Sequence, residues 1–598
     1  MSYKVPVDDI NFNLKTMGLL EQIQNLPGFE EITDDLVDAI IEENARLVEE
    51  EMAPLNIVGD QDHPVCTNGE VTLSKGFKEA LTLFTEGGWQ ALQHDPEFGG
   101  QGFPKLISTI LAENLNAANM AFALCPCLTD GCIEAISQAG TEEQKQRYIP
   151  PMVEGRWTGT MNLTEPQAGS DLALLKSRAV RQDDGTYRIS GQKIFITWGE
   201  HDAAENIIHL VLARTPDAPE GVKGISLFVV PKFLVNEDGS LGKRNDVFCA
   251  SLEHKLGIHG SPTAVMVFGD NKGEVGEGAV AYLIGEENDG LRHMFVMMNE
   301  ARFAIGVQGA SISERAMQMA WSYAQERLQG NAVEGGSRET VSINKHPDVR
   351  RMLMTIKSLT EGSRATALYG ASRADLANHH TDPQERARYQ AIYEYLVPIV
   401  KGFSTEMAQE ATSLALQVHG GMGFIEETGI AQLYRDARIL PIYEGTTAIQ
   451  ANDIIGRKTM RDEGAVAKYF IEEMQDTVAR LDAHPNEDLR FIGQRLERAV
   501  DAYAEVVDFL LKLGAKRAMN QAFSASVPYL MLAGYVHSAW QLARQALVAA
   551  DMDNGHHEKV ATALFYAAHI TPRVNSLAEA AMASEQCVKS FEGINFDA

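Results

Sequence analysis

Residues 186–199, TYRISGQKIFITWG, decide the fold class because they form a β-rich run inside a chain whose other patterns are mainly helical. Their β-branched and aromatic residues are of the types enriched in strands. Three further runs share this character: NIIHLVLART (206–215), GISLFVVPK (224–232) and TAVMVFGD (263–270). Gly, Asp, Asn and Pro clusters separate the runs at the spacing typical of an antiparallel sandwich or barrel. Residues from about 156 to 285 therefore predict a β domain.

Helical patterns lie on both sides of this part. Before it, apolar residues recur at helical spacing at Leu36, Ile40, Ile41 and Leu47. After Gly290 the helical period returns, with an apolar face formed by Ile305, Ile312, Ala316, Met319 and Tyr323. A polar, Gly-rich segment at 330–348 interrupts it before further helices to about 460. The chain thus predicts the order α, β, α.

Beyond about Thr459 the sequence predicts an added helical bundle. Apolar residues recur there at intervals of three and four, at Ile492, Leu496, Val500, Tyr503, Val507 and Leu510. Such a stripe is more often a packing surface than a binding groove. The predicted fold class is therefore α+β: an N-terminal helical domain (1–155), a middle antiparallel β-barrel or sandwich (156–285), a C-terminal helical bundle (286–460) and an additional helical domain (461–598).

The composition excludes several classes of partner. The 598 residues are 45% hydrophobic and 22% charged, and 82 acidic against 52 basic residues give a formal net charge of −30. No general attraction to nucleic acid or anionic lipid is therefore expected. No apolar run approaches the length that spans a bilayer, and the first residues do not resemble a secretion signal. We expect a cytoplasmic protein without a membrane span.

The cysteines predict neither disulfides nor a metal site. Six cysteines in so long a chain do not make a disulfide framework. Cys125, Cys127 and Cys132 have no second cysteine pair and no neighbouring histidine that would complete a zinc site. We interpret them as small buried side chains.

Four segments carry candidate chemistry, although each alone has an ordinary structural explanation. Residues 161–174, MNLTEPQAGSDLAL, contain a turn of small residues that lets backbone N–H groups approach a ligand. Residues 193–199, KIFITWG, place an aromatic ring and a hydroxyl on one side of a strand. Residues 417–424, QVHGGMGF, end a helix with glycines that can expose backbone donors. Residues 438–450, RILPIYEGTTAIQ, put Glu444 between an apolar run and a helix start.

Together, in this order and spacing, these segments resemble the acyl-CoA dehydrogenase family, flavin enzymes with an α-helical, β-barrel, α-helical layout. The resemblance covers roughly residues 35 to 460 and rests on LTEPQAGSD, IFITWG, QVHGGMGF and IYEGTTAIQ. Neither a G-x-G-x-x-G motif after a strand nor a Walker A loop occurs, so nicotinamide and nucleotide-triphosphate functions lose their main support. The added C-terminal helices resemble long bacterial members, which act on 3-methylthiopropanoyl-CoA or on ordinary fatty acyl-CoA.

The resemblance implies that the chain binds FAD. It places Leu163, Thr164, Phe195 and Thr197 around the flavin ring, with Thr164 at the pyrimidine side and Thr197 near N5. Thr446 would contact the same FAD.

A second set of residues is implied to reach the adenosine and pyrophosphate part of the FAD held by the other subunit of a homodimer. The set consists of Arg327, Gln417, Gly420 and Gly421. The family usually has Arg-x-Thr-Phe-Gly where this chain has Arg-Leu-Gln-Gly from Arg327, so within this motif the resemblance supports the inter-subunit FAD contact only at Arg327.

For coenzyme A and the acyl group, the resemblance implies contacts from Ser170, Asn299 and Arg302, with Tyr443 and Gly445 beside the thioester.

Glu444 is then the predicted base. Removing a weakly acidic α-proton from a thioester needs a base within hydrogen-bond reach in a site that excludes water. Ile442, Tyr443 and the acyl chain would raise the pKa of the carboxyl group, whereas a helix starting near Thr447 would favour the ionised form. In the family, the backbone N–H of this glutamate and a flavin ribityl hydroxyl stabilise the thioester oxygen, and a hydride passes from the β-carbon to flavin N5.

Three functions fit these residues. The first is a dehydrogenase that passes electrons to an electron-transfer flavoprotein. The second is an acyl-CoA oxidase with the same base and flavin, which aerobic peroxide formation would identify. The third is a non-catalytic acyl-CoA-binding protein, which purification of a colourless protein would indicate. The sequence does not distinguish acyl chain lengths, because one methylene changes binding by only about 1–3 kcal/mol.

Overall fold

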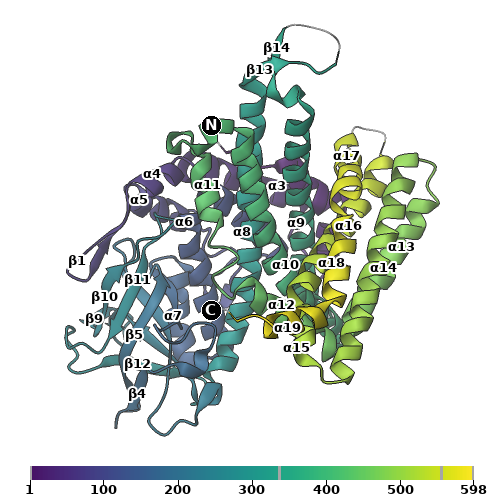
Figure 1. Cartoon of the computed structure of the whole chain (residues 1–598). Coiled ribbons are helices and arrows are strands. Elements are labelled where there is room, and N and C mark those ends of the chain that lie inside the picture. Colours follow the sequence, from purple (N-terminus) through teal and green to yellow (C-terminus); the bar gives the residue numbers. More distant parts are fainter. Residues whose placement is uncertain (1–2, 335–338, 553–555, 596–598) are drawn as a thin grey trace.

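Long central helices separate a β domain from a second helical bundle (Figure 1). The computed structural model describes residues 3–334, 339–552 and 556–595. The fold class is the predicted one, with helices before and after a β domain and further helices at the C-terminal end. The domain limits at 155, 285 and 460 stay a prediction.

The N-terminal part is helical, as expected, but it also contains a short hairpin that the sequence did not indicate. The helices are α1 (Val7–Asn11), α2 (Leu19–Gln24), α3 (Asp34–Leu47), α4 (Leu55–Gln61), α5 (Phe77–Glu86), α6 (Lys105–Ala139) and α7 (Glu142–Val153). The hairpin strands are β1 (Val65–Thr67) and β2 (Glu70–Thr72). A Thr141 side chain that accepts a hydrogen bond from the Gln144 N–H, in a reciprocal capping box, starts α7.

α6 is the helix that brings the N-terminal part to the site. It is the one helix among the described residues that is long and apolar enough to cross a membrane, yet 72% of its most apolar window is buried inside the protein. Asn119 has non-helical backbone angles and Pro126 lies inside the helix, so α6 is kinked. A buried helix of this kind is typical of a protein core.

The β domain is built on an eight-stranded sheet. Its path runs β10-β11-β5-β12-β7-β6-β3, and β4 pairs with β5. The strands are β3 (Trp157–Asn162), β4 (Arg178–Arg181), β5 (Tyr187–Thr197), β6 (Asn206–Ala213), β7 (Ser226–Pro231), β10 (Val247–Leu252), β11 (Thr263–Phe268) and β12 (Ala279–Ile284). A separate pair consists of β8 (Phe233–Val235) and β9 (Leu241–Arg244).

The sheet is antiparallel as predicted except at one strand pair. β3 and β6 run parallel, with Trp157 opposite Asn206, because the chain between them crosses over by way of β4 and β5. The Ile194 N–H donates to the Thr164 carbonyl at 2.9 Å, which joins the segment after β3 to β5. The ring of strands from β5 through β12, β7 and β6 to β3 is thereby closed like a barrel.

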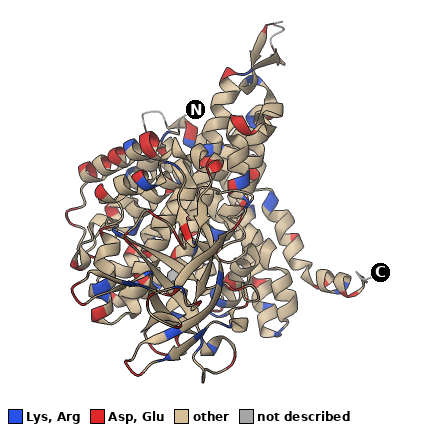
Figure 2. Ribbon diagram, turned by 90° about the vertical axis from the view of Figure 1, so that its left-hand side faces the viewer, with Lys and Arg blue, Asp and Glu red and all other residues tan. Residues whose placement is uncertain are grey.

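Three long helices form the centre of the molecule: α8 (Gly290–Glu326), α9 (Pro347–His379) and α10 (Pro383–Val418). Between α8 and α9 a hairpin of β13 (Leu328–Asn331) and β14 (Thr340–Ser342) projects beyond the helix ends (Figure 2). This hairpin takes the place of the predicted polar segment. Two shorter helices, α11 (Ile430–Ala437) and α12 (Thr447–Ile455), follow α10 and flank the loop that contains Glu444.

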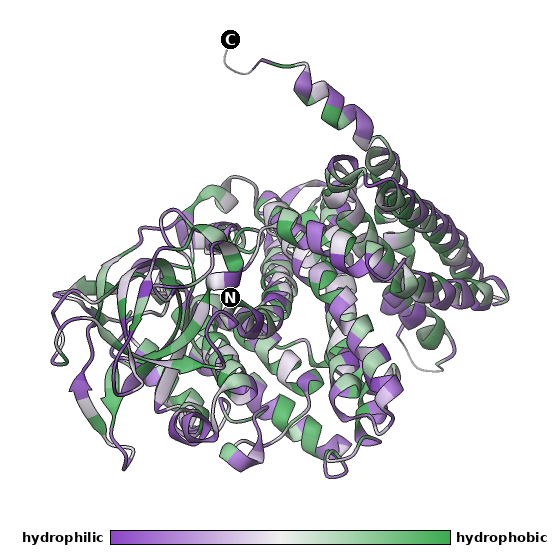
Figure 3. Ribbon diagram, turned by 90° about the horizontal axis from the view of Figure 1, so that it is seen from below, coloured by the Kyte–Doolittle hydropathy of each residue, from purple (hydrophilic) through white to green (hydrophobic). Residues whose placement is uncertain are grey.

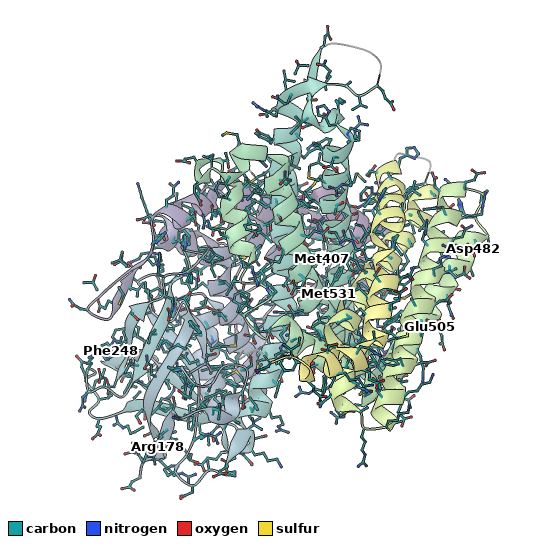
Figure 4. The ribbon with its side chains drawn as sticks, viewed as in Figure 1. Arg178, Phe248, Met407, Asp482, Glu505 and Met531 are labelled. Atoms are coloured by element: carbon teal, nitrogen blue, oxygen red, sulfur yellow. The ribbon has the colours of Figure 1, made fainter. Side chains whose placement is uncertain are left out.

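The predicted C-terminal bundle is present. Its helices are α13 (Ala465–Asp482), α14 (Glu487–Ala515), α15 (Met519–Ser524), α16 (Ser526–Ala550), α17 (His557–Phe565), α18 (Arg573–Met582) and α19 (Ser584–Glu592). The predicted stripe on α14 is at most 2% exposed, so it is a packing surface. α16 packs against α9 and α10, where Met407 and Met531 lie at the junction, whereas Asp482 and Glu505 stand on the outer side (Figure 4). α19 extends away from the body (Figure 3).

The core of this bundle contains a histidine without hydrogen bonds. His537 on α16 is fully buried, and neither ring nitrogen has a partner among the described residues. Its ring packs edge-on against Phe470, with centroids 4.5 Å apart. Burial lowers the pKa of His537 to about 3. Because the unfolded histidine titrates near 6.5, the stability that the neutral ring contributes is complete above that pH and is lost as the pH falls.

We therefore expect His537→Leu to make unfolding less sensitive to acid. Between pH 7.5 and pH 5, His537 should lower the free energy of unfolding of the parent by about 2 kcal/mol, and the variant should lack this contribution. Urea unfolding at pH 7.5 and pH 5 measures the difference. The exposed His557 on α17 provides the control, since His557→Leu should keep the pH dependence of the parent. An equal loss of stability in parent and His537 variant would contradict this prediction.

Candidate active site

The loop between α11 and α12 holds Glu444 in an unusual backbone conformation. Glu444 has φ 53° and the next residue, Gly445, has φ 92°. A left-handed conformation suits glycine but costs energy for a glutamate, and such strain gathers at functional sites. The Thr446 side chain then accepts a hydrogen bond from the Ile449 N–H and caps α12, as the predicted helix start requires.

Two side chains that the sequence analysis did not single out hold this loop. The Lys401 ammonium donates to the carbonyl oxygens of Leu440 at 2.9 Å and Gly445 at 2.6 Å. The amide of Gln450 donates to the Glu444 carbonyl at 3.4 Å. Lys401 lies on α10 and Gln450 on α12, and both side chains are fully buried. Nothing in a helical run marks a lysine as inward-facing, so only the fold reveals this contact.

Two positively charged side chains act on the Glu444 carboxylate. Burial raises its pKa above the ordinary value, and the neighbouring Arg302 and Lys401 counteract the shift. Glu444 is thus only partly exposed, and two cations act on its carboxylate. This balance of opposing effects is the one predicted for a base, although the cations and not only the helix end supply the stabilising charge.

Arg302 lies on α8 with its side chain 4% exposed. Its Nε atom has no hydrogen-bond partner within the described part of the chain. Burial lowers the pKa of Arg302, and Glu444 and Asp453 act in the opposite direction. A buried guanidinium donor without a partner fits a site that a polar ligand completes. Asn299 lies one turn earlier on α8 and is partly buried.

Two further side chains border Glu444. The Tyr443 hydroxyl donates to Gln308 Oε1 at 2.5 Å, and Gln308 in turn donates to Asn116 at 3.0 Å, which fixes the tyrosine ring. Cys127 on α6 is only partly buried, so its prediction as a buried side chain is wrong. Burial and the nearby Asp130 and Glu444 raise the pKa of the Cys127 thiol to about 12, which keeps it neutral. Cys125 and Cys132 are buried as predicted.

The residues predicted around a flavin ring come together on the β domain. Leu163 and Thr164 follow β3, and the Leu163 carbonyl accepts a hydrogen bond from Lys193 Nζ at 3.1 Å. Lys193 also pairs with Glu165 at 2.9 Å, where both side chains are at most 3% exposed. This buried ion pair fixes the loop after β3 against β5. Ser170, further along the loop, is exposed.

Phe195 lies at a β-bulge in β5. The pairing with β11 shifts register between Ala264 and Met266, and Phe195 has φ 61°. Its ring is 59% exposed, whereas the next residue, Ile196, is 2% exposed. Phe195 and the partly exposed Thr197 therefore share the open side of the strand, as the sequence predicts. An exposed aromatic face beside a hydroxyl fits a planar cofactor.

The second predicted set lies elsewhere. Arg327 ends α8, and Gln417, Gly420 and Gly421 lie at the end of α10, all exposed. The two helix ends meet where the rings of Tyr323 and His419 stack with centroids 4.4 Å apart. A side chain added at either glycine would meet nothing within 4 Å, so their backbone is open to a ligand. Along α8 the distance from Arg302 to Arg327 is about 37 Å.

Among the described residues, no group of three or more His, Cys, Asp or Glu side chains is arranged to hold a metal ion. The predicted residues thus form three groups: one around Glu444 with Arg302 and Tyr443, one on the open side of β5 with the loop after β3, and one at the far ends of α8 and α10.

Four family models match consecutive parts of the chain. They are "Acyl-CoA dehydrogenase, N-terminal domain" at residues 37–156, "middle domain" at 160–271, "C-terminal domain" at 288–460, and "Acetyl-CoA dehydrogenase C-terminal like" at 470–592.

Related proteins cover nearly the whole chain. A 3-methylmercaptopropionyl-CoA dehydrogenase of Ruegeria pomeroyi is 51% identical, over 95% of this chain and 96% of the relative. The broad-specificity linear acyl-CoA dehydrogenase FadE5 of Mycobacterium tuberculosis is 34% identical, over 96% and 97%. Among solved structures, Caenorhabditis elegans ACDH-11 in complex with C11-CoA has a TM-score of 0.75 at 20% identity, covering 98% of this chain and 96% of its own.

Proposed function

Since the chain belongs to the acyl-CoA dehydrogenase family, we propose that Glu444 is the base with which it oxidises an acyl-CoA thioester to a trans-2-enoyl-CoA. The enzyme class and the FAD cofactor follow from family membership. The observation that carries the residue assignment is the Glu444 carboxylate, held in a left-handed turn and faced by Arg302 and Lys401. No residue of this site needs a metal ion for the reaction we propose.

In the proposed reaction the Cα–H bond breaks and its proton passes to the Glu444 carboxylate. FAD, when bound, accepts the hydride that leaves the β-carbon. The protein places the base, excludes water and orients the thioester. Tyr443, whose hydroxyl donates to Gln308, and the backbone of Gly445 would border the reacting carbons.

The open residues of the β domain fit FAD. Leu163, Thr164, Phe195 and Thr197 would surround the flavin ring. The Phe195 ring is 59% exposed and the Thr164 and Thr197 side chains are partly exposed, so they offer an aromatic face and two hydroxyls to a planar ligand. Thr446 would contact the same cofactor. The unpartnered donor of Arg302, with Asn299 and Ser170, would contact coenzyme A.

We propose a homodimer in which Arg327, Gln417, Gly420 and Gly421 reach the FAD of the partner. Arg327 lies about 37 Å from Arg302 along α8, so this set is well separated from the residues beside Glu444. Beside these glycines, Met422, Phe424 and Ile425 are 47%, 85% and 45% exposed. A second copy of the chain would cover this apolar surface, since patches of this kind usually mark an interface.

For the substrate we propose 3-methylthiopropanoyl-CoA ahead of a fatty acyl-CoA, because the relative that acts on it is 51% identical whereas FadE5 is 34% identical. We further propose an electron-transfer flavoprotein as electron acceptor and a cytoplasmic location.

A panel of acyl-CoA esters from short to long, with 3-methylthiopropanoyl-CoA among them, tests this function. Each ester is mixed anaerobically with the purified yellow protein, and flavin bleaching and the enoyl-CoA product are measured. We expect the highest kcat/KM with 3-methylthiopropanoyl-CoA. No bleaching with any ester would overturn the proposal. Rapid reoxidation by air with peroxide would identify an oxidase instead.

A further inference from the structure

Lys401 is a fully buried lysine whose ammonium group contacts backbone carbonyls rather than a carboxylate. Among the described residues, these two carbonyls are the acceptors of its hydrogen bonds, whereas Glu444 and Glu406 act on its charge without a hydrogen bond. A buried ammonium without a directly bonded carboxylate is costly, since desolvation disfavours the charge. Burial accordingly lowers the pKa of Lys401 to about 8, with Glu444 acting in the opposite direction. This cost indicates that the Lys401 ammonium has a specific function at this position.

The two carbonyls that Lys401 binds lie on either side of Glu444. Leu440 is itself buried and precedes the turn, and Gly445 follows Glu444 directly. The bonds of 2.9 and 2.6 Å therefore tie both ends of the turn to α10, which packs firmly against α8 and α9. Gln450 adds a weaker bond to the Glu444 carbonyl between them.

We propose that Lys401 is a positioning residue that holds the turn of residues 440–445 in the left-handed conformation in which Glu444 faces the acyl thioester. This inference rests on the proposed role of Glu444 as base. Without the Lys401 ammonium, we expect Glu444 to leave φ 53°, because a non-glycine residue has a lower conformational energy in the common backbone regions.

Lys401 also supplies charge. The charged and titratable groups that act on Glu444 are Arg302 of α8 and Lys401 of α10. Cys127 of α6 faces Glu444 as a neutral thiol. Near Lys401, Glu406 is occupied by a hydrogen bond of 2.5 Å from Thr447. Removing the ammonium therefore leaves Arg302 as the cation beside the base, and the pKa of Glu444 rises.

The test compares Lys401→Met with Lys401→Arg in the FAD-loaded protein. Methionine keeps the apolar stem and removes the donors and the charge, so we expect flavin reduction about 100-fold slower with KM changed less than threefold. The acidic limb of the pH–rate profile should move to higher pH in the methionine variant, because the pKa of Glu444 rises. Arginine keeps charge and donors, so it should return that limb to the position of the parent.

Gln450→Met separates geometry from charge. It removes a donor to the loop without removing a charge, so the rate should fall while the pH limb stays in place. Lys559→Met is the matched control, because Lys559 is also a buried lysine but pairs with Asp9 and Glu361 far along the chain from Glu444. It should lower the melting temperature and leave the pH profile unchanged.

A folded, FAD-containing Lys401→Met variant with the rate and pH profile of the parent would overturn the inference while leaving Glu444 as base. If none of the acyl-CoA esters reduces the flavin of the parent protein, the proposed function is overturned instead. In that case a crystal structure of Lys401→Met still tests the positioning role of Lys401. We expect Glu444 to leave the left-handed region, and an unchanged turn at residues 440–445 refutes that role.

Discussion

Glu444→Gln should bind FAD and acyl-CoA normally yet reduce its flavin about 10³–10⁴-fold more slowly than the parent. The amide has nearly the shape of the carboxylate but cannot accept the α-proton. Because Arg302 and Lys401 remain, the variant should also keep its fold. Anaerobic stopped-flow measurement of flavin bleaching gives the rate, and titration with the product enoyl-CoA gives the affinity.

The control is Glu427→Gln, an exposed carboxylate in the same part of the chain, which should leave the rate unchanged. Glu444→Asp should fall between parent and glutamine variant, since the base is retained but withdrawn by one methylene. Flavin reduction by Glu444→Gln within tenfold of the parent rate would exclude this residue as the base.

The elements of the fold that local pattern controls could be predicted from the sequence. The strands around 186–270 show β-branched runs, and the α14 stripe shows helical period, because one face of each is buried. The two short hairpins, β1–β2 and β13–β14, were missed because strands of three or four residues are too short to show such a period. The parallel pairing of β3 with β6 is a non-local contact that no local pattern contains.

For the site, the resemblance identified the segments and the structure supplied their surroundings. Glu444, Tyr443, Gly445 and Arg302 do come together, although the roles assigned to them stay a prediction. Lys401 could not be recognised, because a lysine in a helix is ordinarily read as part of the solvated face. Its neighbour in space is more than thirty residues away in sequence, at Leu440. Chemistry that depends on burial becomes visible only once the fold decides what is buried.

Arg364 on α9 provides the other large effect, on stability. Its side chain is 1% exposed and pairs with Asp9 of α1 at 2.6 Å, Glu113 of α6 at 2.6 Å and Glu314 of α8 at 2.8 Å. Although burial opposes its charge, Glu113 and Glu314 raise the pKa of Arg364. Arg364→Met leaves Glu113 and Glu314 without the cation that pairs with them, whereas Asp9 keeps Lys559, and the loss should cost about 3–5 kcal/mol. Urea unfolding at pH 8 measures the loss.

The pH dependence separates this mechanism from lost packing. Without Arg364, the pKa of Glu113, already raised by burial, rises further in the folded state and stays ordinary in the unfolded state. A raised carboxyl pKa destabilises the fold at high pH and less so as the proton binds, so the deficit of Arg364→Met should shrink between pH 8 and pH 5.5. Adding Glu113→Gln to Arg364→Met should restore part of the stability at pH 8. The exposed pair of Arg351 and Asp348 on the same helix is the control, since Arg351→Met should cost about 0–1 kcal/mol. A deficit of Arg364→Met that is equal at both pH values would mean that lost contacts, not unpaired carboxylates, explain it.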